Sequence, residues 1–227
     1  MRIDAVIVAL AALAASTAVA QVAPSADERA RYTGLFAAAS NGDAVALDAA
    51  LRAGGRVDAR DAYERTPLHV AAYAGRHDAM RALVRAGADP NALERDRYDI
   101  VTIAAVANDV PTLRVALALG GSARNVTSRY DGTALIAAAH LGHAEIVRTL
   151  IAAGAPLDHV NNLGWTALIE SIVLGDGGAR HVDTLRALVD AGADVNRADR
   201  NGTRPLALAQ GRGYDAMTAI LVRAGAR

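Results

Sequence analysis

The sequence contains no cysteine and no lysine, and only eight of its 227 residues are aromatic. Without cysteine, the chain has no disulfide, no thiolate metal site and no cysteine nucleophile. Its 24 basic residues, all arginine, balance 24 acidic ones, so the basic excess typical of nucleic-acid-binding proteins is missing. We therefore expect no nucleic-acid partner. Arginine without lysine, together with abundant alanine, indicates a GC-rich bacterial genome.

Glycine, by contrast, recurs at a nearly fixed interval. Six Gly-centred loops follow one another at spacings of 33, 33, 34, 38 and 33 residues, at Gly54, Gly87, Gly120, Gly154, Gly192 and Gly225. A repeat of this length indicates one small supersecondary unit stacked several times. Because stacked repeats present long surfaces, this pattern favours a protein that binds other macromolecules.

The second unit shows what fills the interval. Thr66 suits a helix N-cap, Pro67 suits the first helical position, and Gly75 suits the end of a short helix. A second helix, with apolar residues at helical spacing, ends at the next loop glycine. The run that starts at Thr66, Thr-Pro-Leu-His-Val-Ala, matches the T-P-L-H-x-A signature. The chain therefore resembles the ankyrin-repeat family over about residues 28–227.

This resemblance implies an all-α fold, an ankyrin-repeat solenoid of about six helix–turn–helix units with β-turn or hairpin fingers. The units span residues 28–60, 61–93, 94–127, 128–160, 161–198 and 199–227. Residues 21–27 form a linker that begins the N-terminal cap, in which Ser25 and Glu28 fit a capping box.

Unit three departs most from the pattern. Asp99 stands where the N-cap threonine is expected, while Arg97 and Asn108 replace two turn glycines. Asp99 still suits an N-cap, and asparagine tolerates the left-handed conformation. We therefore predict that the unit is retained.

Residues 1–20 carry the pattern of a secretory signal peptide. Arg2 precedes an apolar run, and Ala18-Val-Ala20 fits a cleavage site before Gln21. An uncleaved membrane anchor is the alternative, but the run of 16 residues from Ala5 to Ala20 is shorter than the ~20 that a span requires. We expect export to the bacterial periplasm, or secretion, after cleavage near Ala20, with no membrane insertion after cleavage, and a monomer.

The resemblance also implies a concave face, built from the turn tips and the exposed side of each unit's first helix. Five of the eight aromatic residues fall at the positions that form this face. One interpretation of this pattern is a binding surface, because tyrosine, tryptophan and arginine dominate binding hot spots. The alternative is purely structural: aromatic rings are excluded from the crowded alanine positions and must lie elsewhere. We predict that a protein partner contacts Tyr63, Arg65, Tyr73, Arg95, Asp96, Tyr98, Arg129, Tyr130, His140, Leu141, Leu163 and Trp165.

The sequence predicts no enzyme, no catalytic residue, no cofactor and no metal. His140 and His143 have i, i+3 spacing, but Gly142 separates them and a third zinc ligand is missing. The resemblance implies structural roles for His69, His77, His143 and His181. The alternative function is an enzyme or small-molecule binder with a pocket near units three and four, lined by Arg95, Asp96, Arg129 and His140.

The interval of 38 residues indicates a five-residue insertion, Asp176 to Arg180, between the two helices of unit five. We expect a tolerated surface loop there rather than an accessory contact, because helix tips accept insertions.

Overall fold

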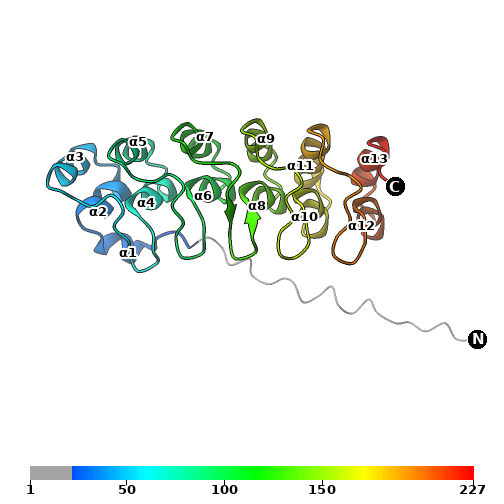
Figure 1. Cartoon of the computed structure of the whole chain (residues 1–227), viewed down its shortest axis with the longest axis horizontal. Coiled ribbons are helices and arrows are strands. Elements are labelled where there is room, and N and C mark those ends of the chain that lie inside the picture. Colours follow the sequence, from blue (N-terminus) through cyan, green and yellow to red (C-terminus); the bar gives the residue numbers. More distant parts are fainter. Residues whose placement is uncertain (1–21) are drawn as a thin grey trace, which may run out of the picture.

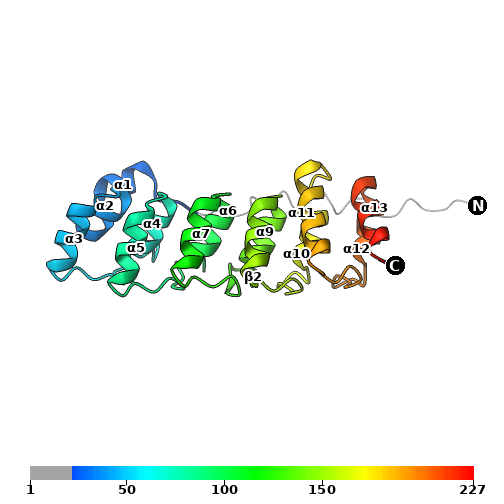
Figure 2. The same cartoon turned by 90° about the horizontal axis from the view of Figure 1, so that it is seen from above.

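The computed structural model describes residues 22–227, and the predicted signal peptide at residues 1–20 lies outside them. Helix pairs stack side by side along one long axis, in two layers (Figures 1 and 2). The inner layer consists of α2 (Gly34–Asn41), α4 (Pro67–Tyr73), α6 (Ile100–Val106), α8 (Ala134–His140), α10 (Ala167–Val173) and α12 (Pro205–Gly211). The outer layer consists of α3 (Ala44–Arg52), α5 (His77–Arg85), α7 (Val110–Ala118), α9 (Ala144–Ala152), α11 (Ala179–Asp190) and α13 (Asp215–Arg223). The predicted solenoid of six units is confirmed.

The inner helices begin where the sequence places their N-caps. The Thr66 side chain accepts the backbone N–H of His69, and Thr133 and Thr166 act in the same way for α8 and α10. Such a cap satisfies one of the backbone donors left free at a helix start. Small residues such as Ala71 and Ala104 then allow the helices to approach closely, so one apolar core runs along the stack.

Unit three keeps the fold through a different polar network. One oxygen of the buried Asp99 carboxylate accepts the Thr102 N–H at 2.8 Å, and the other accepts the Asn125 side-chain amide at 2.8 Å. Arg97 and Asn108 adopt positive φ angles of 66° and 55°, in the left-handed region that the replaced glycines would occupy. The prediction that this unit is retained is confirmed.

The finger between units three and four is a short hairpin. Strands β1 (Val126–Thr127) and β2 (Gly132–Thr133) pair antiparallel, with Val126 opposite Thr133. In the part of the chain that the structure describes, these are the only strands, and the other fingers are turns.

The described part of the chain begins with a segment, residues 22–33, that folds back against the first two units. Helix α1 (Ala26–Arg31) starts with the predicted capping box, in which Ser25 and Glu28 exchange hydrogen bonds of 2.7 and 3.1 Å. Helix α1 contacts α2, and the residues before it reach α4. The first unit is therefore held by an additional helix.

The insertion in unit five packs more tightly than the sequence predicts. Helix α11 has 12 residues where α9 has nine, so the added residues partly lengthen the helix. The Tyr214 hydroxyl of the last unit donates to the Gly175 carbonyl at 2.9 Å, and a Cβ on Gly177 would lie 2.5 Å from the Tyr214 ring. The loop lies at the surface, as expected, with Asp176, Gly178 and Arg180 exposed, and Gly177 also brings it into contact with unit six.

Candidate functional site

The candidate site is the surface formed by the turn tips and the exposed side of the inner helices, which we call the inner face. At each of five turns, one side-chain oxygen accepts the backbone N–H groups two and four residues later. These acceptors are Asp61, Glu94, Ser128, Asn161 and Asp199. Because the five tips share this geometry, the residues at equivalent tip positions form rows along the stack.

In four of the five turns, the second residue links its tip to the one before. Arg95 donates to the Ala62 carbonyl, Arg129 donates to the Asp96 carboxylate at 2.7 Å, and Asn162 donates to the Arg129 carbonyl at 3.1 Å. The Arg129 side chain is nevertheless half exposed, and Arg95 is exposed as well. These predicted contact residues therefore brace the fingers and remain accessible to a partner.

The predicted aromatic residues reach the surface to different degrees. Tyr130 is 39% exposed, and its apolar neighbour in the next turn, Leu163, is 38% exposed. Tyr63, Tyr98 and Trp165 are each partly exposed. The tips of units four and five adjoin directly, since the Asn162 N–H donates to the Tyr130 carbonyl at 2.9 Å. Tyr130, Leu163 and Trp165 thus lie on neighbouring fingers.

The Tyr63 ring lies between two arginines. The guanidinium carbons of Arg65 and Arg95 lie 4.5 and 4.9 Å from its centroid. Both distances suit a cation–π contact, which fixes the ring at the tip of the second unit.

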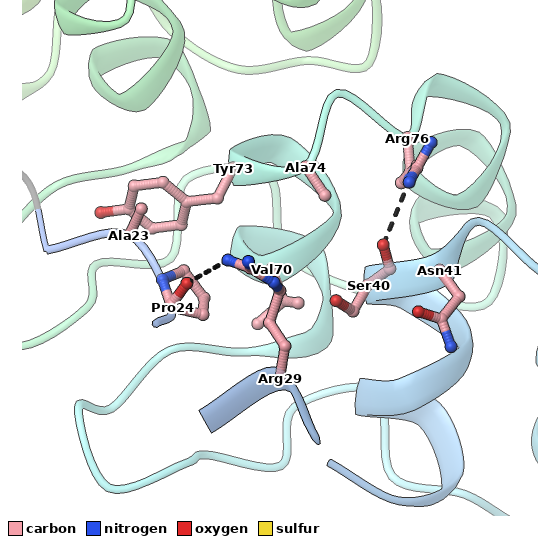
Figure 3. Close-up of a pocket in the computed structure, with 9 residues that line it drawn as sticks. All are labelled: Ala23, Pro24, Arg29, Ser40, Asn41, Val70, Tyr73, Ala74 and Arg76. Atoms are coloured by element: carbon pink, nitrogen blue, oxygen red, sulfur yellow. Dashed lines mark hydrogen bonds between the residues drawn. The ribbon is translucent and has the colours of Figure 1, made fainter. Parts of the chain in front are cut away.

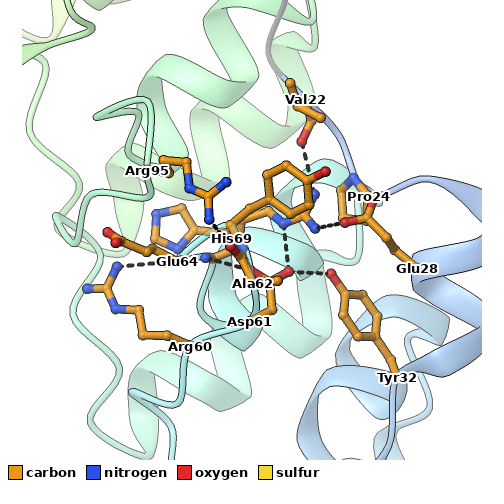
Figure 4. Close-up of polar contacts among 12 residues, drawn as sticks. Val22, Pro24, Glu28, Tyr32, Arg60, Asp61, Ala62, Glu64, His69 and Arg95 are labelled. Carbon is orange, nitrogen blue, oxygen red and sulfur yellow. Dashed lines mark hydrogen bonds and ion pairs between the residues drawn. The ribbon is translucent and has the colours of Figure 1, made fainter.

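Arg65 corrects the sequence prediction of a partner contact, because its side chain is buried, with 1% exposed. Its guanidinium pairs with Glu28 at 2.6 Å and with Asp61 at 2.7 Å, and it also donates to the Val22 carbonyl at 3.0 Å. Figure 4 shows Glu28, Tyr32 and Val22 converging on the turn that begins at Asp61. These three residues belong to residues 22–33, which we call the N-terminal segment. Burial alone would raise the pKa of Asp61, but hydrogen bonds from the Tyr32 hydroxyl and from Arg65 lower it overall. Arg65 thus serves to anchor the N-terminal segment.

Tyr73 is partly exposed, as Tyr98 is, but its hydroxyl is buried. Its ring lies over Ala23 and Pro24 (Figure 3), and it is half-buried. The buried hydroxyl has no hydrogen-bond partner within residues 22–227, and burial raises its pKa. The N-terminal segment therefore covers the inner face at unit two, and the open part of that face begins at unit three.

A cavity of about 330 Å³ lies beside this covered region, between the N-terminal segment and the ends of α2 and α4 (Figure 3). Its two arginines are already engaged, since Arg29 donates to the Pro24 carbonyl and Arg76 donates to the Ser40 carbonyl at 3.2 Å. The cavity is far in sequence from units three and four, where a pocket was the alternative prediction.

The four residues expected to line that alternative pocket have different partners. Arg95 contacts the second unit, Asp96 and Arg129 pair with one another, and His140 faces Glu170. The structure therefore does not bring them together around a common point.

Four of the six histidines bridge neighbouring units. Nε2 of His69 lies 3.2 Å from the Tyr98 carbonyl of unit three and 2.9 Å from the Ala92 carbonyl of its own unit, and burial lowers the pKa of this ring to about 4. The other three bridges run to a hydroxyl or carbonyl of another unit, from His77 to Thr112, His143 to Ala105 and His181 to His140. His159 instead donates to the Asp131 carbonyl within its own unit. The structural roles implied for His69, His77, His143 and His181 are confirmed. Among residues 22–227, no group of three or more histidines and carboxylates is arranged to hold a metal ion.

The remaining histidine, His140, lies against Glu170, a residue that the sequence did not single out. Its Nδ1 is 3.5 Å from Oε2 of Glu170, which is 5% exposed, while Oε1 of Glu170 accepts the Asn161 amide at 2.7 Å. Burial raises the pKa of Glu170 to about 7, and burial also lowers the pKa of His140, an effect that the charge of His181 increases. One feature of the sequence could have identified this site. Glu170 places a carboxyl at a helix position that is apolar in the other units.

No helix within residues 22–227 is long and apolar enough to span a bilayer. The sequence matches the protein-family model described as ankyrin repeats (3 copies) over residues 9–94 and 101–199. The ankyrin repeat protein YahD of Escherichia coli is 32% identical over 190 residues, which cover 83% of this chain and 94% of that protein.

Solved structures agree with this relationship. An ankyrin repeat domain from Acinetobacter baumannii is 42% identical and superposes with a TM-score of 0.79, over 85% of this chain and 98% of that one. The ankyrin repeat domain of Bcl-3, a member of the IκB protein family, is 29% identical with a TM-score of 0.77, over 87% of this chain and 88% of that one. Ankyrin repeats are protein–protein interaction modules and are generally not enzymes. The chain, with six stacked helix pairs and the matching signature in its second unit, belongs to the ankyrin-repeat family.

Proposed function

We propose that this chain is a non-enzymatic interaction module of the bacterial periplasm, which binds a protein partner through the inner face of units three to five. The observation that supports it best is the exposed row at the tips, where Tyr130, Leu163 and Trp165 lie on adjoining fingers. Large rings at regular spacing suit a binding surface, because they bury much area at a small cost in conformational entropy.

The N-terminal segment narrows the region where a partner binds. Because it covers the inner face beside Tyr73 and buries Arg65, the free part of that face extends from Tyr98 towards the C-terminal units. Tyr63, Arg95 and Asp96 lie at the edge of this region. Partner contacts are therefore expected mainly at Tyr98, Arg129, Tyr130, His140, Leu141, Leu163 and Trp165.

Affinity capture tests this assignment. The chain starting at Gln21 is immobilised and exposed to an envelope fraction of the source bacterium, and bound proteins are identified by mass spectrometry. A variant that combines Tyr98→Ala, Tyr130→Ala and Trp165→Ala should lose the partner and keep its helical circular dichroism. The matched control changes Val45, which is 80% exposed on the outer helix α3, to alanine and should retain the partner. Retention by the aromatic variant would refute the assignment.

Export is tested separately. The full-length gene is expressed with its first 20 residues, and the protein is recovered from the periplasmic fraction and sequenced from its N-terminus. Cleavage as proposed gives a chain that starts with Gln21, because Ala18-Val-Ala20 is the expected processing site. A full-length chain retained in the cytoplasm would contradict export, and a mass by light scattering equal to one chain would support the expected monomer.

A further inference from the structure

Two equivalent positions of the inner helices, compared across units two to six, differ in one pair of neighbouring units. The first position carries Val70, Ile103, Ala137 and Leu208 in four units, but Glu170 in unit five. The second carries Tyr73, Val106, Val173 and Gly211, but His140 in unit four. Helices α8 and α10 are neighbours, so the two titratable residues meet at helix positions that are mostly apolar in the other units.

Glu170 is a buried carboxyl without a cationic partner. Asn161 holds one oxygen at 2.7 Å, whereas the 3.5 Å from Oε2 to Nδ1 of His140 exceeds an ordinary hydrogen bond. Asp61 and Asp96, which are also shielded from solvent, pair with Arg65 and Arg129, but within residues 22–227 no arginine pairs with Glu170. Burying a carboxyl costs free energy unless it is paired, and such groups are concentrated at functional sites.

We propose that Glu170 and His140 form a receptor for a cationic side chain, arginine or lysine, of the protein bound on the inner face. The inference rests on the proposed function, since it assigns one contact within that surface. Asn161 fixes Oε1 and leaves Oε2 facing the His140 ring, which is itself one-third exposed and forms the outer wall of the site. A guanidinium fits this arrangement best, because it pairs with a carboxylate in one plane and can stack on an imidazole.

The site takes a cation and rejects an anion because of the groups around it. From α8 the group that faces Glu170 is His140, whose backbone carbonyl accepts Nε2–H of His181 from α11 at 2.9 Å, while Nδ1 of His181 lies 2.8 Å from Asp176. Helix α12 carries no charged side chain. An incoming guanidinium would therefore be the first full positive charge in contact with the Glu170 carboxylate.

Binding of the cation should depend on pH in one direction. The bound guanidinium requires ionised Glu170, whose pKa burial raises to about 7, so below that pH a proton must leave before the cation binds. Protonation of His140 at still lower pH adds repulsion. Affinity should thus fall by up to about tenfold for each pH unit below 7.

Nuclear magnetic resonance with a defined probe tests the site. Nα-acetyl-arginine amide is added to the chain starting at Gln21, and the uncharged citrulline analogue is the matched ligand control. The arginine probe should shift the Glu170 carboxyl, the His140 ring and the Asn161 amide, with weak affinity because one side chain buries little area. Glu170→Gln keeps an acceptor for Asn161 and should abolish these shifts, while Glu145→Gln, an exposed carboxyl on the outer helix α9, should leave them unchanged.

The outcomes separate this inference from the proposed function. Equal binding of the citrulline analogue, or unchanged binding of the arginine probe to Glu170→Gln, would overturn the receptor even if the aromatic variant loses the partner. If instead the aromatic variant keeps the partner, the proposed function fails, whatever the probe does at Glu170. If both hold, Glu170→Gln should also weaken capture of the partner, and more strongly at pH 8 than at pH 6.

Discussion

The guanidinium of Arg65 lies 2.6 Å from the carboxylate of Glu28, 37 residues earlier in the chain, and this ion pair closes the N-terminal segment over the second unit. The two side chains that pair with the Arg65 guanidinium, Glu28 and Asp61, are both acidic, and only 1% of the arginine is exposed. The pair therefore supports the cap of the repeat stack and leaves units three to five as the open binding surface.

Replacing Arg65 should destabilise the N-terminal half of the stack. Arg65→Met keeps the apolar stem but leaves the carboxylates of Glu28 and Asp61 without their shared cation. Because removing one partner of a buried ion pair costs far more than removing an exposed one, we expect a loss of about 3 kcal/mol in the free energy of unfolding. Urea denaturation followed by circular dichroism measures it. Arg81→Ala, which removes an exposed partner of Asp78, should change stability by less than about 1 kcal/mol, and an equal effect of both variants would argue against a structural role for Arg65.

His69 should make the fold sensitive to acid. Its ring is neutral and buried in the folded state, with a pKa lowered to about 4 from an ordinary value near 6.5. The unfolded chain thus binds a proton that the folded chain does not, so the stabilisation is complete above pH 6.5 and is lost as pH falls towards 4. The loss amounts to about 3 kcal/mol, at 1.36 kcal/mol for each unit. In His69→Leu, unfolding free energies measured from pH 7 to pH 4 should fall less steeply than in the natural chain, and parallel curves would contradict the assignment.

Glu170 should act in the opposite direction. Its pKa is raised to about 7 from 4.5, so the folded state favours the protonated carboxyl and loses stability as pH rises through 7. Glu170→Gln should therefore gain stability relative to the natural chain between pH 5 and pH 8, by about 3 kcal/mol at most. The same comparison for Glu145→Gln should show no such gain. A pH-independent difference for Glu170→Gln would mean that the carboxyl is ionised at no cost in the fold.

The periodic glycines predict the fold because each unit must end its helices at equivalent points, and the six loop glycines do take positive φ angles. The same register predicts the N-caps at Thr66, Thr133 and Thr166. Unit three was also predictable, since Asp99 and Asn108 offer the same capping and backbone properties as the residues they replace.

The site was less predictable, because burial depends on contacts between distant segments. Arg65 occupies a position that Tyr98 and Trp165 share in other units, yet Glu28 and Val22 cover only Arg65. Glu170 was missed because its partner His140 belongs to the preceding unit, 30 residues away. The repeat register predicts the position of each residue within its unit. It does not predict which side chains from another segment contact that residue.

The inserted loop should be sensitive to a side chain at Gly177. This residue has a φ of 70° and lies against the Tyr214 ring, so Gly177→Val adds both backbone strain and a clash. We expect unit six to loosen, with faster hydrogen exchange in α12 and α13 and little change in α4 to α7. Gly213→Val is the control for backbone strain alone, because its φ is 69° and nothing lies within 4 Å of an added Cβ. Similar exchange in the two variants would show that the contact with Tyr214 does not matter.

Hydrogen exchange of the chain with and without its captured partner tests the proposed binding face most directly. The partner should protect the turn tips at residues 94–98, 128–132 and 161–165, together with the ends of α8 and α10 near His140 and Glu170. The outer helices α7, α9 and α11 should exchange as they do in the free chain. Protection confined to those outer helices, with unchanged exchange at the tips, would contradict binding through the inner face.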